Sequence, residues 1–307
     1  MSESEQNPRI LVTGASGLLG RAILRVFQDR FGKSNVIGLA FSRAQDLGLV
    51  KCDLRDSIAV EAIIREYHPD IVIHSAAERK PDACESDPEG SALLNVTAVF
   101  ALAAASAKAK AAFVYISTDY LFDGTAAPYN EDAKTCPLNE YGRLKLRGEH
   151  AALAAHPRPF ILRVPVLFGP CSDVTESAVT TFAKAAKDSQ KLQKIDDWQI
   201  RVPTYTLDIA ETLVLISRAL FLKEGSPSGI FNYSSNVRVT RWALVQLFGK
   251  ILSCDISHIT KLDGPPPGAP RPYDCQLLTT KLEKLGLAAP HTPFEIALKA
   301  SLDGLLL

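Results

Sequence analysis

The sequence predicts an α/β fold of the Rossmann type, a doubly wound parallel sheet with a smaller C-terminal α/β lobe. Two observations lead to this prediction. In the first half of the chain, short and almost continuously apolar runs alternate with helical patterns, as expected for parallel strands that are covered by helices on both faces. A glycine-rich turn also joins the first predicted strand to the first predicted helix, which is the usual opening of such a fold.

Strands and helices alternate regularly as far as Gly169. The predicted strands are 9–14, 35–41, 70–77, 111–118 and 159–169, with a further short strand just before 51–56. The predicted helices are 17–31, 56–68, 88–108 and 140–155. The region around 88–108 is the most apolar in the chain, but Lys108 and Lys110 interrupt it. A buried helix followed by a strand therefore explains it better than a membrane span.

Beyond Gly169 the pattern is less regular. It predicts a loop, an extended piece and a helix within 196–220, and then the following: a strand at 228–235, a helix at 240–252, a Pro/Gly-rich loop at 263–274, and helices at 279–287 and 292–306. We therefore predict a Rossmann domain over 8–167, to which 204–232 returns. A smaller lobe for a substrate or partner is expected over 168–203 and 233–307.

The composition excludes several classes of function. The chain has 307 residues, with 34 basic and 34 acidic side chains, and this balance argues against a nucleic-acid-binding or membrane-surface protein. The N-terminus is polar, unlike a secretory signal. Six scattered cysteines have no metal-ligand spacing and are interpreted as reduced thiols of a cytoplasmic protein without a metal site.

The turn V-T-G-A-S-G-L-L-G is typical of dinucleotide binding. Gly14 permits the sharp turn, Gly17 lets the backbone approach a pyrophosphate, and Gly20 lets the helix pack closely on the strand. The main-chain N–H groups around the turn would face the phosphates at the positive end of the helix; these belong to Ser16, Gly17, Leu18 and Leu19. A strand–turn–helix also needs glycine for structural reasons, but the position of this one within a βαβ series favours a cofactor.

The end of the second strand indicates which dinucleotide is bound. An NAD enzyme usually places an acid there for the ribose 2′-hydroxyl, but this chain has Phe41, Ser42 and Arg43. A hydroxyl and a guanidinium suit a 2′-phosphate, which favours NADP(H). The alternative is that Arg43 is an ordinary solvated loop residue. Asp46 lies too far along the chain to replace the missing acid.

Further contacts to the cofactor are expected after the next strands. Asp53 and the backbone of Leu54 are placed to border the adenine. Small residues end the fourth predicted strand and would admit the cofactor; these are Ser75, Ala76 and Ala77. Arg79 could reach the phosphates, or form a surface pair with Lys80.

Tyr141 and Lys145 are four residues apart at the start of the helix 140–155, so they lie on one helical face. A phenol beside an ammonium has a lowered pKa and can donate a proton to a carbonyl while hydride arrives from a nicotinamide. The lysine would also hydrogen-bond the nicotinamide ribose. Thr118, at the end of the preceding strand, would orient the carbonyl. Such a pair is also common on solvated helices, so its context with Thr118 and the glycine turn carries the interpretation.

Together these motifs resemble the extended short-chain dehydrogenase/reductases, and most of all the dTDP-4-dehydrorhamnose reductase family. The resemblance rests on the glycine turn, H-S-A-A-E-R-K-P-D, Y-I-S-T-D-Y-L-F-D-G, Y-G-R-L-K and L-R-V-P-V-L-F-G. It implies a catalytic triad of Thr118, Tyr141 and Lys145, a cofactor contact from Leu167, and reduction of a 4-keto nucleotide-sugar with NADPH. Dehydratase relatives usually carry an acid pair after the threonine, whereas here Tyr120 follows Asp119.

The chain also resembles, mostly through its C-terminal half, one group within this family, the regulatory β subunits of methionine adenosyltransferase. The motifs are A-A-E-R-K-P-D, E-S-A-V-T-T-F, I-D-D-W-Q-I-R-V-P-T-Y-T-L-D-I-A and the run from Gly268 to Gly286. Tyr273 to Cys275, and Phe294 where the sugar reductases carry tryptophan, point the same way. This resemblance implies an NADP-binding, non-catalytic subunit whose partner is the catalytic subunit that makes S-adenosylmethionine. The tail with which the animal members dock is not matched, so we expect either no docking or docking through another surface.

Two functions therefore remain open, and the regulatory subunit is favoured. In that function Tyr141 and Lys145 hold the cofactor. In the other, a reductase uses them on a nucleotide-sugar-like small molecule.

Overall fold

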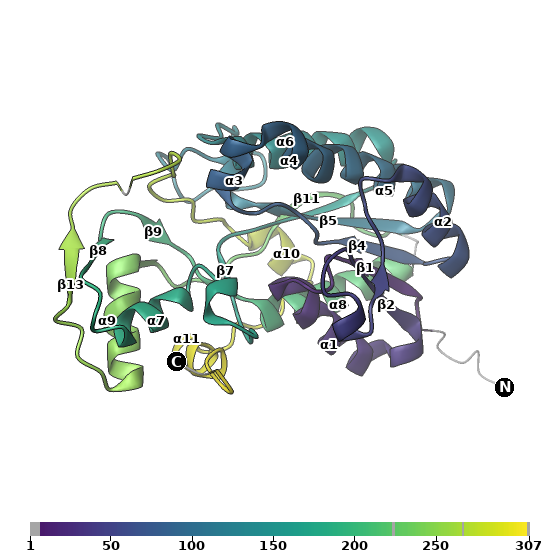
Figure 1. Ribbon diagram of the computed structural model, residues 1–307. Coiled ribbons are helices and arrows are strands. Elements are labelled where there is room, and N and C mark those ends of the chain that lie inside the picture. The colour runs from purple at the N-terminus through teal and green to yellow at the C-terminus, as the bar shows by residue number, and fades with distance from the viewer. Residues whose placement is uncertain (1–6, 223–224, 266, 306–307) are drawn as a thin grey trace.

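The computed structural model describes residues 7–222, 225–265 and 267–305, and a seven-stranded parallel sheet forms its centre (Figure 1). From one edge to the other the strands are β3 (Val50–Lys51), β2 (Val36–Ala40), β1 (Ile10–Thr13), β4 (Ile71–His74), β5 (Ala112–Thr118), β6 (Phe160–Val164) and β11 (Gly229–Asn232). All neighbouring pairs are parallel. The strand order changes direction between β1 and β4, the place where ligands bind in open α/β sheets. The predicted fold class is confirmed.

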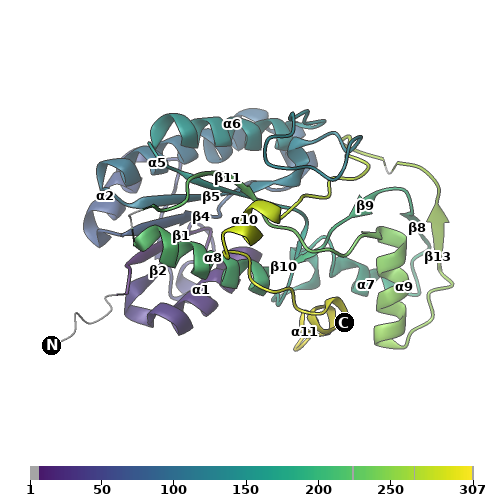
Figure 2. The ribbon, with the colours of Figure 1, turned by 180° about the vertical axis from the view of Figure 1, so that it is seen from behind.

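Helices cover both faces of this sheet (Figures 1 and 2). On one face lie α1 (Leu18–Phe31), α8 (Thr206–Phe221) and α10 (Thr280–Lys284). On the other lie α2 (Ser57–Tyr67), α5 (Ala98–Lys108) and α6 (Glu140–Ala155). Side chains of a strand point alternately to the two faces. Ile10 and Val12 therefore pack with α1 and α8, whereas Leu11 packs with α2 and α5.

The apolar region that was expected to form a buried helix does so. It runs through α4 (Pro88–Ala92), a π-helical turn (Leu93–Thr97) and α5. Within the described chain, Pro88–Lys108 is the helix long and apolar enough to cross a membrane by length and composition. In the fold, Val99 and Leu102 of this helix are buried in the core that α5 shares with the sheet. The strand β5 follows directly, as predicted.

The predicted strand 159–169 is wrong in one respect, because it is two strands. Pro165 lies between β6 and β7 (Leu167–Phe168) and has no N–H to donate to a neighbouring strand. After this break the chain leaves the central sheet, and β7 pairs instead with β10 (Thr204–Tyr205).

The remaining elements form the smaller lobe, on the left of Figure 1. Its helices are α7 (Thr181–Lys187), α9 (Arg241–Leu252) and α11 (Phe294–Ala300). Its strand pairs are β8 (Gln193–Asp196) with β13 (Ile259–Leu262), and β9 (Ile200–Arg201) with β12 (Val239–Thr240). Phe168, Phe248 and Leu298 lie in its core. The short helix α3 (Pro81–Ser86) lies beside α4 and near the start of α6, at the top of Figure 1.

Most C-terminal predictions are confirmed, with shorter bounds. The strand expected at 228–235 is β11, the helix at 240–252 is α9, and the described residues of 263–274 form no helix or strand. The helices expected at 279–287 and 292–306 shrink to α10 and α11, and residue 306 lies outside the described residues. The extended piece and the helix expected within 196–220 are β9, β10 and α8, whereas α3, α7, β8, β12 and β13 have no counterpart among the predicted elements.

Candidate functional site

The glycine turn lies at the carboxyl end of β1, beside the end of β4. Gly14 has a φ of +67°, and a Cβ on it would lie 2.7 Å from the main chain of Ala76. A Cβ on Gly20 would lie 2.1 Å from the carbonyl oxygen of Gly14. Both glycines are therefore required by the close approach of backbone to backbone. Gly17 differs, because its φ is −79° and its Cβ would meet only the Gly14 oxygen, at 3.2 Å.

The residues around the turn divide between core and ligand side. Leu19 is buried in the core behind α1, so its side chain faces away from a ligand and only its N–H can contribute. Ser75 donates from Oγ to the carbonyl oxygen of Thr13 at 2.7 Å, which ties the end of β4 to the turn. The structure thus brings Gly14 together with Ser75 and Ala76. Leu18 and Ala77 are partly buried, and Arg79 is exposed.

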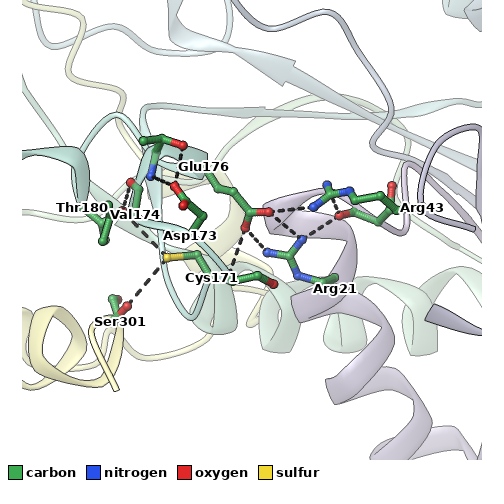
Figure 3. Close-up of polar contacts among 11 residues, drawn as sticks. Arg21, Arg43, Cys171, Asp173, Val174, Glu176, Thr180 and Ser301 are labelled. Carbon is green, nitrogen blue, oxygen red and sulfur yellow. Dashed lines mark hydrogen bonds and ion pairs between the residues drawn. The ribbon is translucent and has the colours of Figure 1, made fainter. Parts of the chain in front are cut away.

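Arg43 follows β2, and its side chain, although 48% exposed, reaches the glycine turn (Figure 3). Its Nη1 donates to Glu176 Oε1 at 2.8 Å, and its Nη2 to the carbonyl oxygen of Ser16 at 2.8 Å. Arg21, one turn into α1, donates to the same Ser16 oxygen at 2.6 Å and pairs with the same carboxylate. Burial alone would raise the pKa of Glu176, but the hydrogen bonds from Arg21 and Arg43 hold that pKa below its usual value.

Neither Arg21 nor Glu176, the two residues that meet Arg43, belongs to the site residues expected from the sequence. Arg21 carries a signal that could have been noticed. A cation in the first turn of a helix faces the positive end of the helix dipole, so its presence there points to a nearby anion. Glu176 carries no such signal, since it lies 133 residues from Arg43 in the chain and only the fold brings the two together.

Phe41 and the two residues expected at the adenine, Asp53 and Leu54, lie together at the ends of β2 and β3. Phe41 is 57% exposed, and the Arg55 guanidinium carbon lies 5.3 Å from its ring centroid. Arg55 also donates from Nη2 to Asp53 Oδ2 at 2.7 Å, and this hydrogen bond lowers the pKa of Asp53. Leu54 is buried beside them. An exposed aromatic ring with a guanidinium over it is a surface on which a base can stack.

Tyr141 is the second residue of α6, and the start of that helix is firmly fixed. Asn139 accepts the N–H of Gly142 at 2.9 Å as N-cap, and donates from Nδ2 to the carbonyl oxygen of Pro270 at 2.8 Å. The rings of Tyr141 and Tyr120 meet edge to face at 5.9 Å. Thr118 and Tyr141 share a hydrogen bond. Thr118 and Tyr141 are thus adjacent, as the triad requires.

Lys145 does not act on Tyr141 in the predicted way. Its Nζ donates to the carbonyl oxygen of Ile116 at 2.6 Å and lies 4.0 Å from the ring centroid of Tyr115. The pKa of Tyr141 is raised by burial, which outweighs the lowering effect of its hydrogen bond with Thr118. The expected lowering of the tyrosine pKa by the lysine is therefore not found in this structure, because burial dominates and the ammonium is directed at β5.

Two further groups near Tyr141 have perturbed pKa values. Burial lowers the pKa of Lys145 to about 7, although Glu149 opposes the change. Burial raises the pKa of Asp119 to about 6, against the opposing effects of Arg201 and the hydrogen bond from Thr118. Strongly shifted groups that gather at the end of a sheet are typical of functional sites.

Basic side chains of the smaller lobe face the same place. Arg201 donates to the Tyr120 hydroxyl at 2.6 Å, and its guanidinium carbon lies 5.2 Å from the Tyr120 ring centroid. Arg241 donates to Asp196 at 3.0 Å and is close enough to Arg201 for the two charges to lower the pKa of Arg241, after burial. Neither arginine is among the site residues expected from the sequence. Among the described residues, no group of three or more His, Cys, Asp or Glu side chains could hold a metal.

Comparison with known proteins places this chain among relatives of two kinds. Methionine adenosyltransferase 2 subunit beta of Xenopus tropicalis is 40% identical over 295 residues, which cover 96% of this chain and 87% of that protein. The dTDP-4-dehydrorhamnose reductase of Aggregatibacter actinomycetemcomitans is 33% identical over 227 residues, which cover 74% of this chain and 73% of that protein.

The fold is also shared with solved structures. The dTDP-4-dehydrorhamnose reductase of Bacillus anthracis, solved in complex with NADP, has a TM-score of 0.79, and the match covers 95% of this chain and 96% of that one at 24% identity. The family model for the RmlD substrate binding domain matches residues 8–306, nearly the whole chain. The resemblance found in the motifs is thereby confirmed: the chain belongs to the RmlD substrate binding domain family.

Proposed function

We propose that this protein is an NADP(H)-binding regulatory subunit of methionine adenosyltransferase, and thus takes part in S-adenosylmethionine biosynthesis. The observation that carries the proposal is the 40% identity to a methionine adenosyltransferase 2 subunit beta, because it extends over 96% of the chain and so includes the smaller lobe. A likeness limited to the glycine turn would argue only for a cofactor. The proposed partner is the catalytic subunit of that enzyme, and the proposed location is the cytoplasm.

The residues at the carboxyl edge of the sheet fit a dinucleotide. Gly17 has no Cβ that would block a pyrophosphate, and the N–H groups at the start of α1 can hold it. Phe41, Asp53 and Leu54 would hold the adenine, and Ser42 with Arg43 the 2′-phosphate. The remaining part of the proposed site comprises Ser75, Ala76, Ala77, Arg79, Tyr141, Lys145 and Leu167.

The elements that belong to the central sheet suggest how the chain divides into domains. Residues 8–167 and 204–232 would make the NADP-binding domain, since α8 and β11 return to the central sheet. Residues 168–203 and 233–307 would make the lobe for a substrate or partner, apart from α10, which packs on the central sheet.

In the regulatory function, Tyr141 and Lys145 clamp the nicotinamide ribose. The geometry supports this, because Lys145 is fixed against β5 and the raised pKa of the partly buried Tyr141 keeps its hydroxyl protonated. The chain itself would supply only binding and orientation.

The second candidate is an NADPH-dependent reductase of a 4-keto nucleotide-sugar. It is favoured by the adjacent Thr118 and Tyr141, which could orient and protonate a carbonyl. The two arginines beside Tyr120 also suit the diphosphate of a nucleotide-sugar.

Affinity purification from the native cell tests the first proposal. We expect the catalytic subunit of methionine adenosyltransferase to co-purify and its kinetics to change when the purified chain is added. No association and no kinetic effect would rule the proposal out. Tyr141→Phe separates the two candidates, since a regulator keeps its partner and its effect. A reductase assayed with NADPH and dTDP-4-dehydrorhamnose loses about 10²-fold or more of its rate.

A further inference from the structure

The carboxylate of Glu176 is seated between two arginines at the glycine turn (Figure 3). Glu176 belongs to a short 3₁₀ turn, Val174–Glu176, in the connection from β7 to α7. It therefore comes from outside the central sheet, whereas Arg21 is on α1 and Arg43 follows β2. Its side chain is only 16% exposed, and Ser172 N adds a further hydrogen bond to Oε2 at 3.2 Å.

Arg21 and Arg43 form an anion-binding site, and the carboxylate of Glu176 occupies it. Each guanidinium donates both to Glu176 and to the carbonyl oxygen of Ser16, so both are oriented by the same two acceptors. Arginines bind carboxylate and phosphate through the same planar arrangement of donors. If Arg43 binds a 2′-phosphate, the phosphate lies next to the carboxylate of Glu176, which already accepts a hydrogen bond from the same arginine. The two negative charges then repel each other.

Glu176 also supplies what the end of β2 lacks. A site for NAD usually has an acid there to accept the ribose 2′-hydroxyl, and in this chain the corresponding residues are Phe41, Ser42 and Arg43. The carboxylate of Glu176 reaches Arg43 from 133 residues further along the chain. With this carboxylate in place, the edge of the site carries both an acid that suits a hydroxyl and an arginine that suits a phosphate.

We propose that Glu176 is a specificity-determining residue, which competes with the 2′-phosphate for Arg21 and Arg43 and so reduces the preference of the site for NADP(H) over NAD(H). The inference rests on the proposed dinucleotide site. It adds that the choice of nucleotide is set from the segment after β7 as well as from the end of β2. The bound 2′-phosphate displaces Glu176, whereas the 2′-hydroxyl leaves it in place.

The displacement has a measurable consequence for the 171–177 segment. Thr180 donates to the carbonyl oxygen of Val174 at 2.8 Å, and Cys171 Sγ lies 3.9 Å from both Thr180 Oγ1 and the carbonyl oxygen of Ser301. These contacts hold the segment on the smaller lobe, while Glu176 ties it to Arg21 and Arg43. NADP⁺ should therefore speed amide hydrogen exchange at 171–177 relative to NAD⁺.

Calorimetric titration of the full chain with NADP⁺ and NAD⁺ tests the proposal. In Glu176→Gln the neutral amide keeps an acceptor for the ribose but gives up its charge. We expect the ratio of affinities, NADP⁺ over NAD⁺, to rise roughly tenfold at low salt and less at high salt. Glu211→Gln is the matched control, because Glu211 pairs with Arg30 elsewhere on α1, at 2.8 Å. That variant should keep the wild-type ratio.

The outcomes separate this inference from the proposed function. An unchanged or lower ratio in Glu176→Gln, with both nucleotides still bound, overturns the role of Glu176 alone. Equal exchange at 171–177 with NADP⁺ and NAD⁺ does the same. If wild type and variant bind neither nucleotide, nor the fragment adenosine 2′,5′-bisphosphate, the dinucleotide site itself is wrong and the inference is overturned with it.

Discussion

The ammonium of Lys145 lies 4.0 Å from the ring centroid of Tyr115, in a place where it is almost completely buried. The same ammonium donates to the carbonyl oxygen of Ile116, so ring and carbonyl together hold it on β5. Thr118 ends the same strand. The lysine and the threonine are therefore positioned by one strand, and Tyr141 is positioned by the capped start of α6.

The buried lysine should make stability depend on pH. Burial lowers the pKa of Lys145 from 10.5 to about 7, so between these values the unfolded chain binds more protons than the folded one. The contribution of Lys145 to the free energy of unfolding therefore rises with pH between about 7 and 10.5. Urea unfolding at pH 7, 8 and 9 should show wild type gaining up to about 1.4 kcal/mol per pH unit relative to Lys145→Met. Lys281→Met is the control, since Lys281 is exposed yet also donates to a carbonyl and lies over an aromatic ring. A parallel pH dependence of wild type and Lys145→Met would contradict the prediction.

Asp119 should produce the opposite trend at lower pH. Burial raises its pKa from 3.8 to about 6, so between these values the folded state binds more protons than the unfolded state. The stability linked to the protonated carboxyl is complete below pH 3.8 and is lost as the pH rises through 6. We expect the free energy of unfolding of wild type to fall by up to about 1.4 kcal/mol per pH unit relative to Asp119→Asn over this range. Asp132→Asn, at an exposed position, should show no such difference. A constant gap between wild type and Asp119→Asn from pH 4 to 6 would refute the assignment.

The glycines of the turn should respond differently to the same substitution. Gly20→Ala places a Cβ 2.1 Å from the Gly14 oxygen and 2.7 Å from the Ala15 Cα, so α1 must move away from β1. We expect a loss of about 3 kcal/mol or more in the free energy of unfolding. Gly17→Ala meets only one atom, at 3.2 Å, and should keep the fold while it weakens dinucleotide binding. Urea unfolding and calorimetry measure the two effects. Equal stability of the two variants would show that Gly20 is not required by packing.

The buried ion pair beneath α6 should be costly to break. Arg163 donates from Nε and Nη2 to both oxygens of Glu149, at 2.8 and 2.7 Å, and the two side chains are 3% and 1% exposed. Glu149→Gln leaves the guanidinium charge buried without its partner, which costs about 3–5 kcal/mol. Glu140→Gln removes a more exposed pair with Arg143 on the same helix and should cost about 0.5 kcal/mol or less. Chemical denaturation compares the two, and similar losses would contradict the assignment.

The parallel sheet and the glycine turn could be predicted because their causes are local. The strand β1 (Ile10–Thr13) is buried along its whole length, and three of its four residues are apolar. Gly14 and Gly20, which the close contacts between main-chain atoms require, are visible directly in the sequence. The strands β8 and β13 have mixed polar sequences and pair across more than sixty residues, so no local pattern marks them. The same limit applies to the site. Thr118, Tyr141 and Arg43 could be predicted as site residues because each belongs to a local sequence motif. The contact of Glu176 with Arg43 could not be predicted, because the two residues are 133 positions apart in the chain and only the fold brings them together.

The position of β11 has a consequence for the order in which the protein is made. Residues 229–232 complete the central sheet by pairing with β6, which was synthesised some seventy residues earlier. During translation, the N–H and C=O groups on that side of β6 therefore have no neighbouring strand to pair with while residues 168–203 are synthesised. An unpaired edge of this kind is where nascent chains associate wrongly. If translation stops before Gly229, because the ribosome stalls or the messenger RNA is cleaved, the released chain lacks β11 and the edge of β6 stays unpaired.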